Sequence, residues 1–271
     1  TIITALSLTP PSAASDLEAR LMDPIVERVF EDYPGLDYVR DLNAGTVPDN
    51  ITISEFFFQP GAMLGNDDAQ RHYRSVNYTH VARDLINAGV NVLMQMGAPG
   101  PDDSRFSLSS NTDVTLDLVP VVEAMRERGE PIWVVGQLNA RMPMMTRSAL
   151  VDAALADAVF EGEKATFKPF GAPAMPVADA DYAIGLRVSS LLEDGGTLQI
   201  GIGSLSDAIA YCCDLRHNHN ADYRTLIDRL NRSDHERTLA EAIGGEDVFE
   251  RGLYGCTEML VDAYIQMYRS G

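Results

Sequence analysis

The chain has 271 residues, of which 45% are hydrophobic and 23% are charged, a composition that is typical of a folded globular protein and excludes an intrinsically disordered one. Its 40 acidic and 21 basic residues give a formal net charge of −19, which disfavours nucleic acid and anionic membrane as partners. No apolar run is long enough to cross a bilayer, so we expect no membrane partner.

The cysteines and the amino-terminal segment predict the cellular compartment. Residues 1–8 are apolar but carry no basic leader and are soon followed by two prolines, so we expect no signal peptide. Cys212, Cys213 and Cys256 cannot all pair, and adjacent cysteines are poor disulfide partners for geometric reasons. Reduced thiols and a cytoplasmic location are therefore expected.

The first predicted element is a helix that begins at the capping box formed by Ser15 and Glu18. Pro24 is expected to bend or split this helix. Its apolar stripe consists of Leu17, Leu21, Ile25 and Val29. Further along the chain, patterns of apolar residues and glycine stops predict strands at 51–58, 90–96, 132–138 and 198–202, and helices at 78–88, 115–128 and 179–192.

Helices that alternate with short, continuously apolar strands predict an α/β fold with a mostly parallel sheet and helices on both faces. The segment 161–178 is rich in proline and glycine and is the best candidate for a linker. We therefore expect an α/β domain at residues 1–178 and the start of a second at 179–271. The polar stretch 214–234 is expected to be irregular.

A glycine turn, Gly201-Ile202-Gly203, follows the predicted strand at 198–202 and precedes a helix. The pattern is similar to a dinucleotide-binding fingerprint, but Ser206 stands where a third glycine or alanine belongs, and no second strand ends in an acidic residue at the usual distance. From periodicity alone, a tight turn between strand and helix with no ligand is the favoured explanation of the glycines. The backbone amides of such a turn would nevertheless face an anion bound at the start of the helix.

Glu258 is the carboxylate that the sequence singles out at a second strand-to-helix junction, within 252–262. A desolvated carboxylate can act as a covalent nucleophile toward an activated acyl group. Small neighbours, Gly255 and Thr257, would admit a bulky thioester. From the residues alone, a glutamate favoured by a helix dipole is the preferred explanation, because no spacing rule selects this residue from the 40 acidic ones.

Other reactive side chains suggest weaker alternatives. Cys256 could act as a nucleophile with His217, His219 or His235 as a base, but nothing in the sequence ties a histidine to it, and a small buried residue is the simpler interpretation. His217, His219 and Asp222 match no established zinc spacing. We therefore expect no metal site.

Four segments in order resemble the acetyl-CoA hydrolase/transferase family of class I CoA-transferases. The segment 98–113 is similar to the family's Ser-Pro-x-Asp-x-x-Gly-x-x-Ser-Leu-Gly loop, 134–143 to its Glu-Val-Asn-x-x-Met-Pro stretch, 181–209 to its Leu-Gln-x-Gly-Ile-Gly segment, and 254–262 to its His-Thr-Glu-Met motif. The departures are Ser104 and either Ser109 or Ser110 in place of glycines, Gly136 in place of an acidic residue, and Gly255-Cys256 in place of Ile-His.

The resemblance implies a CoA-transferase-like fold and acyl-CoA:carboxylate CoA transfer, or hydrolysis of acetyl-CoA or a similar short acyl-CoA, as in acetate metabolism. Glu258 would be the nucleophile and would form a glutamyl-CoA thioester. Gly201, Ile202 and Gly203 would hold CoA or the developing oxyanion, and Gln199 and Asn139 would add polar contacts.

The same resemblance implies the partners of the chain. They would be acyl-CoA, a small carboxylate and further copies of the chain in a homodimer or larger assembly, with CoA as a substrate and no permanently bound cofactor. Family members continue well past the glutamate, so we expect this chain to be truncated before its second half. A non-catalytic CoA-binding module and a dinucleotide-dependent oxidoreductase are the alternatives.

Overall fold

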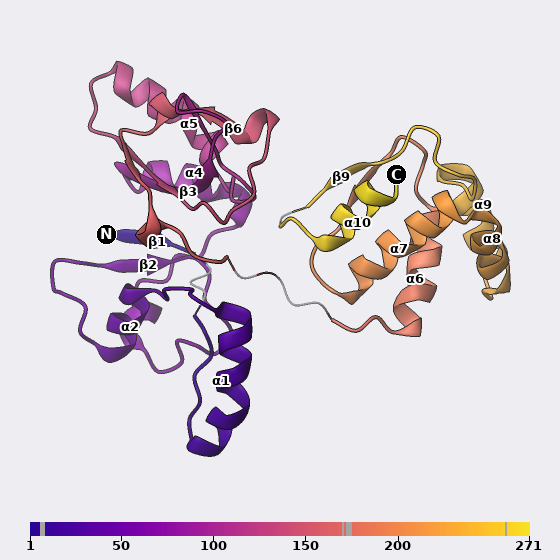
Figure 1. Cartoon of the computed structure of the whole chain (residues 1–271), viewed down its shortest axis with the longest axis horizontal. Helices are drawn as coiled ribbons and strands as arrows, with labels where there is room; N and C mark the ends of the chain where they lie inside the picture. Colours follow the sequence, from indigo (N-terminus) through magenta and orange to yellow (C-terminus); the bar gives the residue numbers. More distant parts are fainter. Residues whose placement is uncertain (6–8, 170, 172–174, 258) are drawn as a thin grey trace. The chain divides into compact units, whose positions relative to one another are not determined.

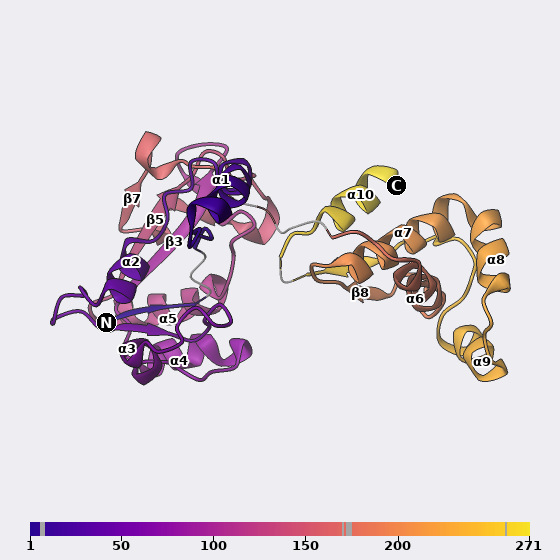
Figure 2. The same ribbon diagram turned by 90° about the horizontal axis from the view of Figure 1, so that it is seen from below.

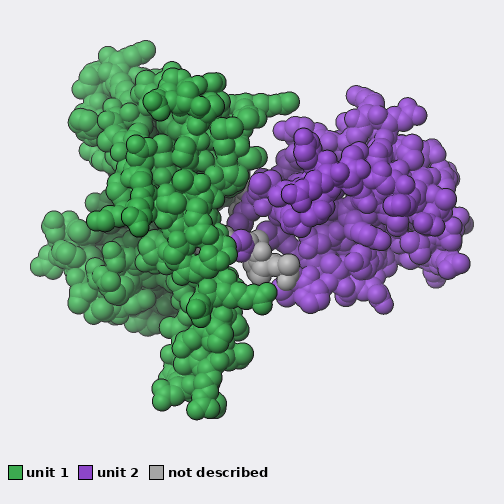
Figure 3. Space-filling model, in the orientation of Figure 1, with its two compact units in different colours: residues 1–170 green, residues 171–271 purple. Residues whose placement is uncertain are grey.

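The computed structural model describes residues 1–5, 9–169, 171, 175–257 and 259–271. The chain forms two compact units, unit 1 (Thr1–Phe170) and unit 2 (Gly171–Gly271), which Figure 3 shows in different colours. The division falls inside the proline- and glycine-rich segment 161–178. Each unit has its own hydrophobic core and is described by itself.

Unit 1 combines helices with short strands. Its helices are α1 (Asp16–Phe30), α2 (Asp37–Ala44), α3 (Asp67–Arg71), α4 (Val81–Asn87) and α5 (Thr115–Glu127), and its strands are β1 (Ile2–Thr4), β2 (Ile53–Glu55), β3 (Val92–Pro99), β4 (Arg105–Ser107), β5 (Trp133–Leu138), β6 (Leu150–Asp152) and β7 (Ala158–Phe160). Short 3-10 helices occupy Tyr78–His80, Arg147–Ala149, Ala153–Leu155 and Glu163–Ala165. The helix predicted at 78–88 thus begins as a 3-10 turn and continues as α4.

The central sheet of unit 1 has five strands in the order β6-β4-β3-β5-β7. Strands β3, β5 and β7 are parallel and lie side by side in Figure 2, whereas β4 and β6 extend the sheet with antiparallel pairs. Strands β1 and β2 form a separate parallel pair. Four of the six strand pairs among the described residues are parallel, which confirms the predicted α/β class with a mostly parallel sheet.

Helix α5 supplies apolar cover for this sheet, because Val122 packs with Ile132 and Val134 in one buried cluster. Other apolar surfaces of unit 1 are exposed. Met94 is 79% exposed and Trp133 is 58% exposed, and the register that aligns Val92 with Trp133 and Met94 with Val135 places these side chains on one face.

Helix α1 begins after Ser15, as predicted, but only the Ser15 half of the predicted capping box is present. The Ser15 hydroxyl accepts a hydrogen bond from the Glu18 amide, and the Glu18 carboxylate accepts one from the Ala14 amide. The helix runs unbroken through Pro24, so the proline does not split it; its fixed φ is compatible with a helix and only one backbone hydrogen bond is lost. The apolar stripe of the helix is exposed, and Leu17 is its most exposed residue.

Unit 2 is a helical layer around one short pair of strands. It contains α6 (Asp179–Ser190), β8 (Thr197–Gln199), α7 (Ser204–Asn218), α8 (Asn220–Arg229), α9 (Asp234–Ile243), β9 (Tyr254–Cys256) and α10 (Asp262–Ser270). Strands β8 and β9 pair in parallel. Helix α7 is packed against α6, α8 and α10, and a Cβ at Gly185 of α6 would lie 2.8 Å from the carbonyl oxygen of Ala208.

The prediction of an irregular stretch at 214–234 is wrong. Helix α7 continues to Asn218, α8 follows at once, and α9 begins at Asp234. The polar composition hides a stripe in which Tyr223 and Ile227, one helical turn apart, are completely buried against Leu186, Cys212 and Leu215. A few well-placed apolar residues are sufficient to fix a helix whose other faces are polar.

Candidate functional site

The two motifs singled out in the sequence meet at one edge of the β8–β9 pair. The parallel register aligns Thr197 with Tyr254 and Gln199 with Cys256, so both strands end at the same edge. Strand β8 leads from there into the glycine turn, and β9 leads into Thr257. Glu258 itself lies outside the described residues. Ligands of open α/β sheets collect at this carboxyl edge, so it is our candidate site.

The glycine turn gives helix α7 an open amino terminus. Gly203 is the residue that precedes the helix, and its φ of +128° lies in a region that side chains rarely adopt. With no side chain at Gly203 to cap them, the amides of the first turn, from Ser204 to Ser206, have no intrahelical acceptor. The turn therefore presents backbone donors of the kind that bind an anion or an oxyanion.

A groove of about 580 Å³ borders this turn within unit 2. This volume is in the range of small-molecule sites. Its lining comes from the turn (Ile202, Gly203), from α7, from α10 and from the two residues that precede α10, Leu260 and Val261. Most of the lining is apolar, and the charged side chains are three carboxylates, Asp207, Asp214 and Asp262. The groove thus suits an apolar or neutral group better than a phosphate.

A buried arginine joins α7 to the end of α6 and to the segment around residue 247. The guanidinium of Arg216, on α7, donates to the carbonyl oxygens of Asp247 (2.7 Å), Ser189 (2.6 Å) and Leu192 (2.9 Å). It also lies 4.0 Å from the centre of the Phe249 ring, and burial lowers its pKa. Sequence reasoning missed this residue, because no local spacing marks an arginine whose acceptors lie on other elements.

The predicted site residues fall into two groups. Gly201, Ile202 and Gly203 lie together at the end of β8, and Gln199 is the exposed last residue of that strand. Asn139 lies in unit 1, after β5, and is completely buried. A substrate contact by Asn139 stays a prediction.

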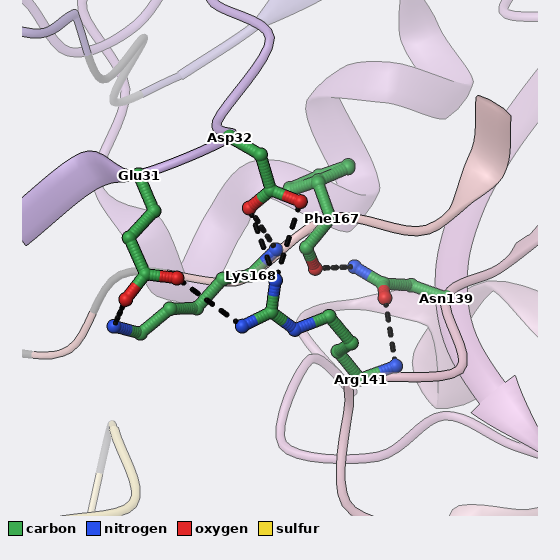
Figure 4. Close-up of polar contacts among 6 residues, drawn as sticks. All are labelled: Glu31, Asp32, Asn139, Arg141, Phe167 and Lys168. Atoms are coloured by element: carbon green, nitrogen blue, oxygen red, sulfur yellow. Dashed lines mark hydrogen bonds and ion pairs between the residues drawn. The ribbon is translucent and has the colours of Figure 1, made fainter. Parts of the chain in front are cut away.

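Both ends of the Asn139 amide bind backbone groups (Figure 4). The side-chain nitrogen donates to the Phe167 carbonyl at 2.8 Å, and the oxygen accepts from the Arg141 amide at 2.9 Å. In this position the side chain joins the loop after β5 to the segment that ends unit 1. Its polar capacity toward a ligand is correspondingly small.

Two cationic side chains and two carboxylates lie around the Asn139 side chain (Figure 4). Arg141 contacts Asp32 at 3.1 Å and Glu31 at 3.3 Å, and Lys168 contacts Glu31 through its amine and Asp32 through its backbone N–H. The Lys168 amine holds the pKa of Glu31 low, and the Lys168 backbone N–H does the same for the pKa of Asp32. The cluster fixes the end of α1 to the segments that follow β5 and precede the linker.

Two of the resembled segments, 98–113 and 134–143, are joined by serine side chains. Ser109 adopts φ +59° and its hydroxyl donates to the Pro143 carbonyl at 2.6 Å. The Ser107 hydroxyl donates to the Met145 carbonyl at 2.8 Å and accepts the Ser109 amide. Glycine adopts a positive φ more readily than serine, so of the two serines in question Ser109, and not Ser110, occupies a position that favours glycine.

The rival reactive groups form no constellation among the described residues. All three cysteines are free thiols, and burial raises the pKa of Cys212 and of Cys213 to about 12, which makes both unreactive. The ring of His217 stacks on Phe249 instead of facing a nucleophile. Within the described part of the chain, no cluster of three or more potential ligands could hold a metal ion.

The dinucleotide alternative lacks its second strand. In that fold, the strand after the glycine-turn helix ends in an acidic residue. Here α8 and α9 follow α7, and the next strand, β9, ends at Cys256.

None of the helices in the described ranges combines the length and the apolar character needed to span a membrane.

Comparisons with known proteins support the fold. No family model and no curated protein matches the chain. RipA from Yersinia pestis matches over 100% of this chain and 55% of its own, at a TM-score of 0.53 and 14% identity. A RipA variant matches at a TM-score of 0.57 and 15% identity, over 100% of this chain and 54% of its own.

RipA has a CoA-transferase-like fold, and this chain therefore has a fold of that type. The 4-hydroxybutyrate CoA-transferase of Porphyromonas gingivalis also matches, at a TM-score of 0.47 and 18% identity, over 100% of this chain and 53% of its own. The fold assignment rests on the RipA structures. The chain spans about half the length of these proteins.

Proposed function

We propose that this chain carries the nucleophile of a CoA-transferase or acyl-CoA hydrolase, with Glu258 as the attacking carboxylate. The observation that carries the proposal is the meeting of the glycine turn and the Glu258 segment at the carboxyl edge of β8 and β9. The four resembled segments and the CoA-transferase-like fold support it from independent directions.

The reaction would proceed by covalent exchange. A carboxylate oxygen of Glu258 attacks the thioester carbon of an acyl-CoA, CoA leaves as a thiolate, and an acyl-glutamyl anhydride forms. The thiolate then attacks the glutamyl carbonyl, which releases the acyl group as a free carboxylate and leaves a glutamyl-CoA thioester. A second carboxylate collects CoA by the same steps in reverse, and water in its place gives hydrolysis.

The groove in unit 2 suggests how the substrate lies. Its apolar walls suit the pantetheine arm or the acyl chain of acetyl-CoA or a similar short acyl-CoA, whereas its three carboxylates would repel the phosphates of CoA. The amides at the start of α7 are the candidates for stabilising the oxyanion, an effect worth about 3–4 kcal/mol per donor in other enzymes. CoA serves here as a substrate, and the acceptor is a small carboxylate or water.

The wider assignments are also proposals. The free, buried thiols are consistent with a reducing compartment such as the cytoplasm. A homodimer or larger assembly follows from the family resemblance.

The test is CoA transfer from acetyl-CoA to a second carboxylate, and its hydrolysis, by the longest natural form of the protein that contains this chain. Glu258→Gln should lower both rates at least about a thousandfold, because it removes the nucleophile. Glu250→Gln, a nearby exposed glutamate, is the matched control and should leave both unchanged. Normal turnover by Glu258→Gln would refute the nucleophile. Binding of CoA without turnover by the unaltered protein would favour a non-catalytic CoA-binding module.

A further inference from the structure

Tyr264, on α10, reaches back across the strand pair that forms the candidate site. Its hydroxyl is within hydrogen-bond distance of two backbone carbonyl oxygens, that of Leu198 in β8 and that of Cys256 in β9, the second at 3.1 Å. One side chain therefore joins both strands near the edge where they end. Nothing in the four resembled segments marked this residue.

The ring of Tyr264 occupies the space that a side chain at position 255 would need. A Cβ placed on Gly255 would lie 2.8 Å from one ring carbon and 3.0 Å from another. The contact requires a glycine because of space rather than backbone conformation, since Gly255 has no positive φ. Gly255 is one of the positions where the chain departs from the family pattern, so the departure and the tyrosine fit one another.

The tyrosine acts on the peptide that leads to the proposed nucleophile. The Cys256 carbonyl accepts the amide of Ile200 at 3.3 Å and also lies 3.1 Å from the Tyr264 hydroxyl, whose single proton is shared between this oxygen and that of Leu198. The Ile200 amide, just after β8, and the Tyr264 hydroxyl, on α10, together restrain the peptide between Cys256 and Thr257. Glu258 is the next residue. Burial raises the pKa of the Tyr264 hydroxyl, so it remains a donor at neutral pH.

We propose that Tyr264 is a positioning residue for the transfer reaction: its hydroxyl fixes the Cys256–Thr257 peptide and thereby the direction in which the chain leaves β9 toward Glu258. This inference rests on the proposed function. Tyr264 reaches no reacting atom through these contacts; it acts through the backbone. Small displacements of a reacting group are known to cost large factors in rate.

The experiment compares Tyr264→Phe, which keeps the ring against Gly255 and removes the hydroxyl, with Tyr268→Phe on the same helix. Tyr268 is 88% exposed and serves as the matched control. For Tyr264→Phe we expect kcat for CoA transfer to fall by about tenfold to a hundredfold with KM for acyl-CoA nearly unchanged. Tyr268→Phe should change neither. An unchanged kcat in Tyr264→Phe, or equal losses in the two variants, would overturn the proposal.

Hydrogen exchange separates the inference from the proposed function. Amides of residues 254–257 should exchange faster in Tyr264→Phe than in Tyr268→Phe whether or not the protein turns over acyl-CoA, and no difference would refute the contact itself. If the unaltered protein transfers no CoA, the proposed function fails and the positioning role fails with it, while the exchange data still judge the contact. If the protein is active, exchange increases and kcat does not fall, only the positioning role fails.

The steric part is tested by Gly255→Ala, alone and with Tyr264→Ala. Alone, the added methyl group meets the ring, and we expect kcat to fall as in Tyr264→Phe. In the Tyr264→Ala background the same methyl group has free space, so it should cause no further loss. Equal effects of Gly255→Ala in both backgrounds would contradict the fit between these two residues.

Discussion

The carboxyl end of β5 in unit 1 and those of β8 and β9 in unit 2 are all ends of parallel strands, yet the polar groups that follow them are used differently. After β5, the side-chain amide of Asn139 is buried and hydrogen-bonded to two backbone groups, and a cluster of ion pairs lies around it. After β8 comes a glycine turn that borders a groove and whose amides have no intrahelical acceptor, and a buried arginine of that unit, Arg216, binds backbone carbonyls on other segments.

The difference shows which polar residues build the fold and which remain for a ligand. A polar group whose hydrogen-bonding capacity is filled by backbone contributes stability and has little left for substrate. Unpartnered backbone donors beside an apolar groove are what a binding site needs. By this criterion we expect the end of β5 to be structural and the ends of β8 and β9 to be functional, and the following changes test that division.

The largest effect on stability is expected for Arg216→Met, on α7 of unit 2. The change removes a buried guanidinium that donates to three carbonyl oxygens, and it should lower the free energy of unfolding by about 3–5 kcal/mol. Arg224→Met is the control: it removes a surface ion pair with Asp247 and should cost less than about 1 kcal/mol. Urea unfolding measures both, and equal losses would refute the supporting role of Arg216.

Asn139→Ala should have the next largest effect. The Phe167 carbonyl and the Arg141 amide lose their partner in a buried place, and the free energy of unfolding should fall by about 2–3 kcal/mol. At a temperature where the variant is folded, its KM for acyl-CoA should equal that of the unaltered protein. Asn91→Ala, at an exposed position, is the matched control. A large rise in KM for Asn139→Ala without loss of stability would contradict the division and return this residue to the site.

Substitutions at Ser109 test a smaller effect, the cost in stability of its positive φ. Ser109→Gly and Ser109→Ala both lose the hydrogen bond to the Pro143 carbonyl, but only glycine relieves the φ of +59°. The glycine variant should therefore be more stable than the alanine variant by about 1 kcal/mol. Thermal unfolding of the two variants side by side gives this difference. If alanine is as stable as glycine, the conformation carries no strain.

The ion pairs around Asn139 should have the smallest effect, and it should depend on pH. The pKa values of Glu31 and Asp32 are lower in the folded protein than in the unfolded chain, where they are about 4. The stability that these carboxylates contribute is therefore complete above the unfolded pKa values and is lost as the pH falls through the folded pKa values. Thermal unfolding should distinguish the unaltered protein from Glu31→Gln/Asp32→Asn slightly at pH 7 and not at pH 2. A difference that is independent of pH would show that charge plays no part.

Much of the fold could be predicted because its signals are local. Ser15 caps the start of α1, and Gly89 and Gly129 follow α4 and α5 with positive φ, as glycine stops do. The glycine turn at the start of α7 lies where the pattern of strand, glycine and helix placed it. These features depend on residues within a few positions of one another.

The rest depends on partners far away in the sequence. The backbone partners of Asn139 become visible only once Phe167 is known to lie beside it, and those of Arg216 only through acceptors on two other segments, 189–192 and around 247. The helices within 214–234 were missed because Tyr223 and Ile227 find their cover on α6 and α7. The meeting of the glycine turn with the Glu258 segment depends on the pairing of β8 with β9, and pairing between distant strands is not encoded in local spacing.

The most direct test of the account is intact-protein mass spectrometry after incubation with acetyl-CoA and treatment with borohydride, on the longest natural form of the protein. The account predicts a CoA adduct that borohydride removes, leaving Glu258 reduced to an alcohol, because a glutamyl thioester is the intermediate. Peptide mapping then locates the reduced residue. A protein that binds CoA and yet forms no adduct, or an adduct on another residue, would contradict the claim that Glu258 at the end of β9 is the nucleophile.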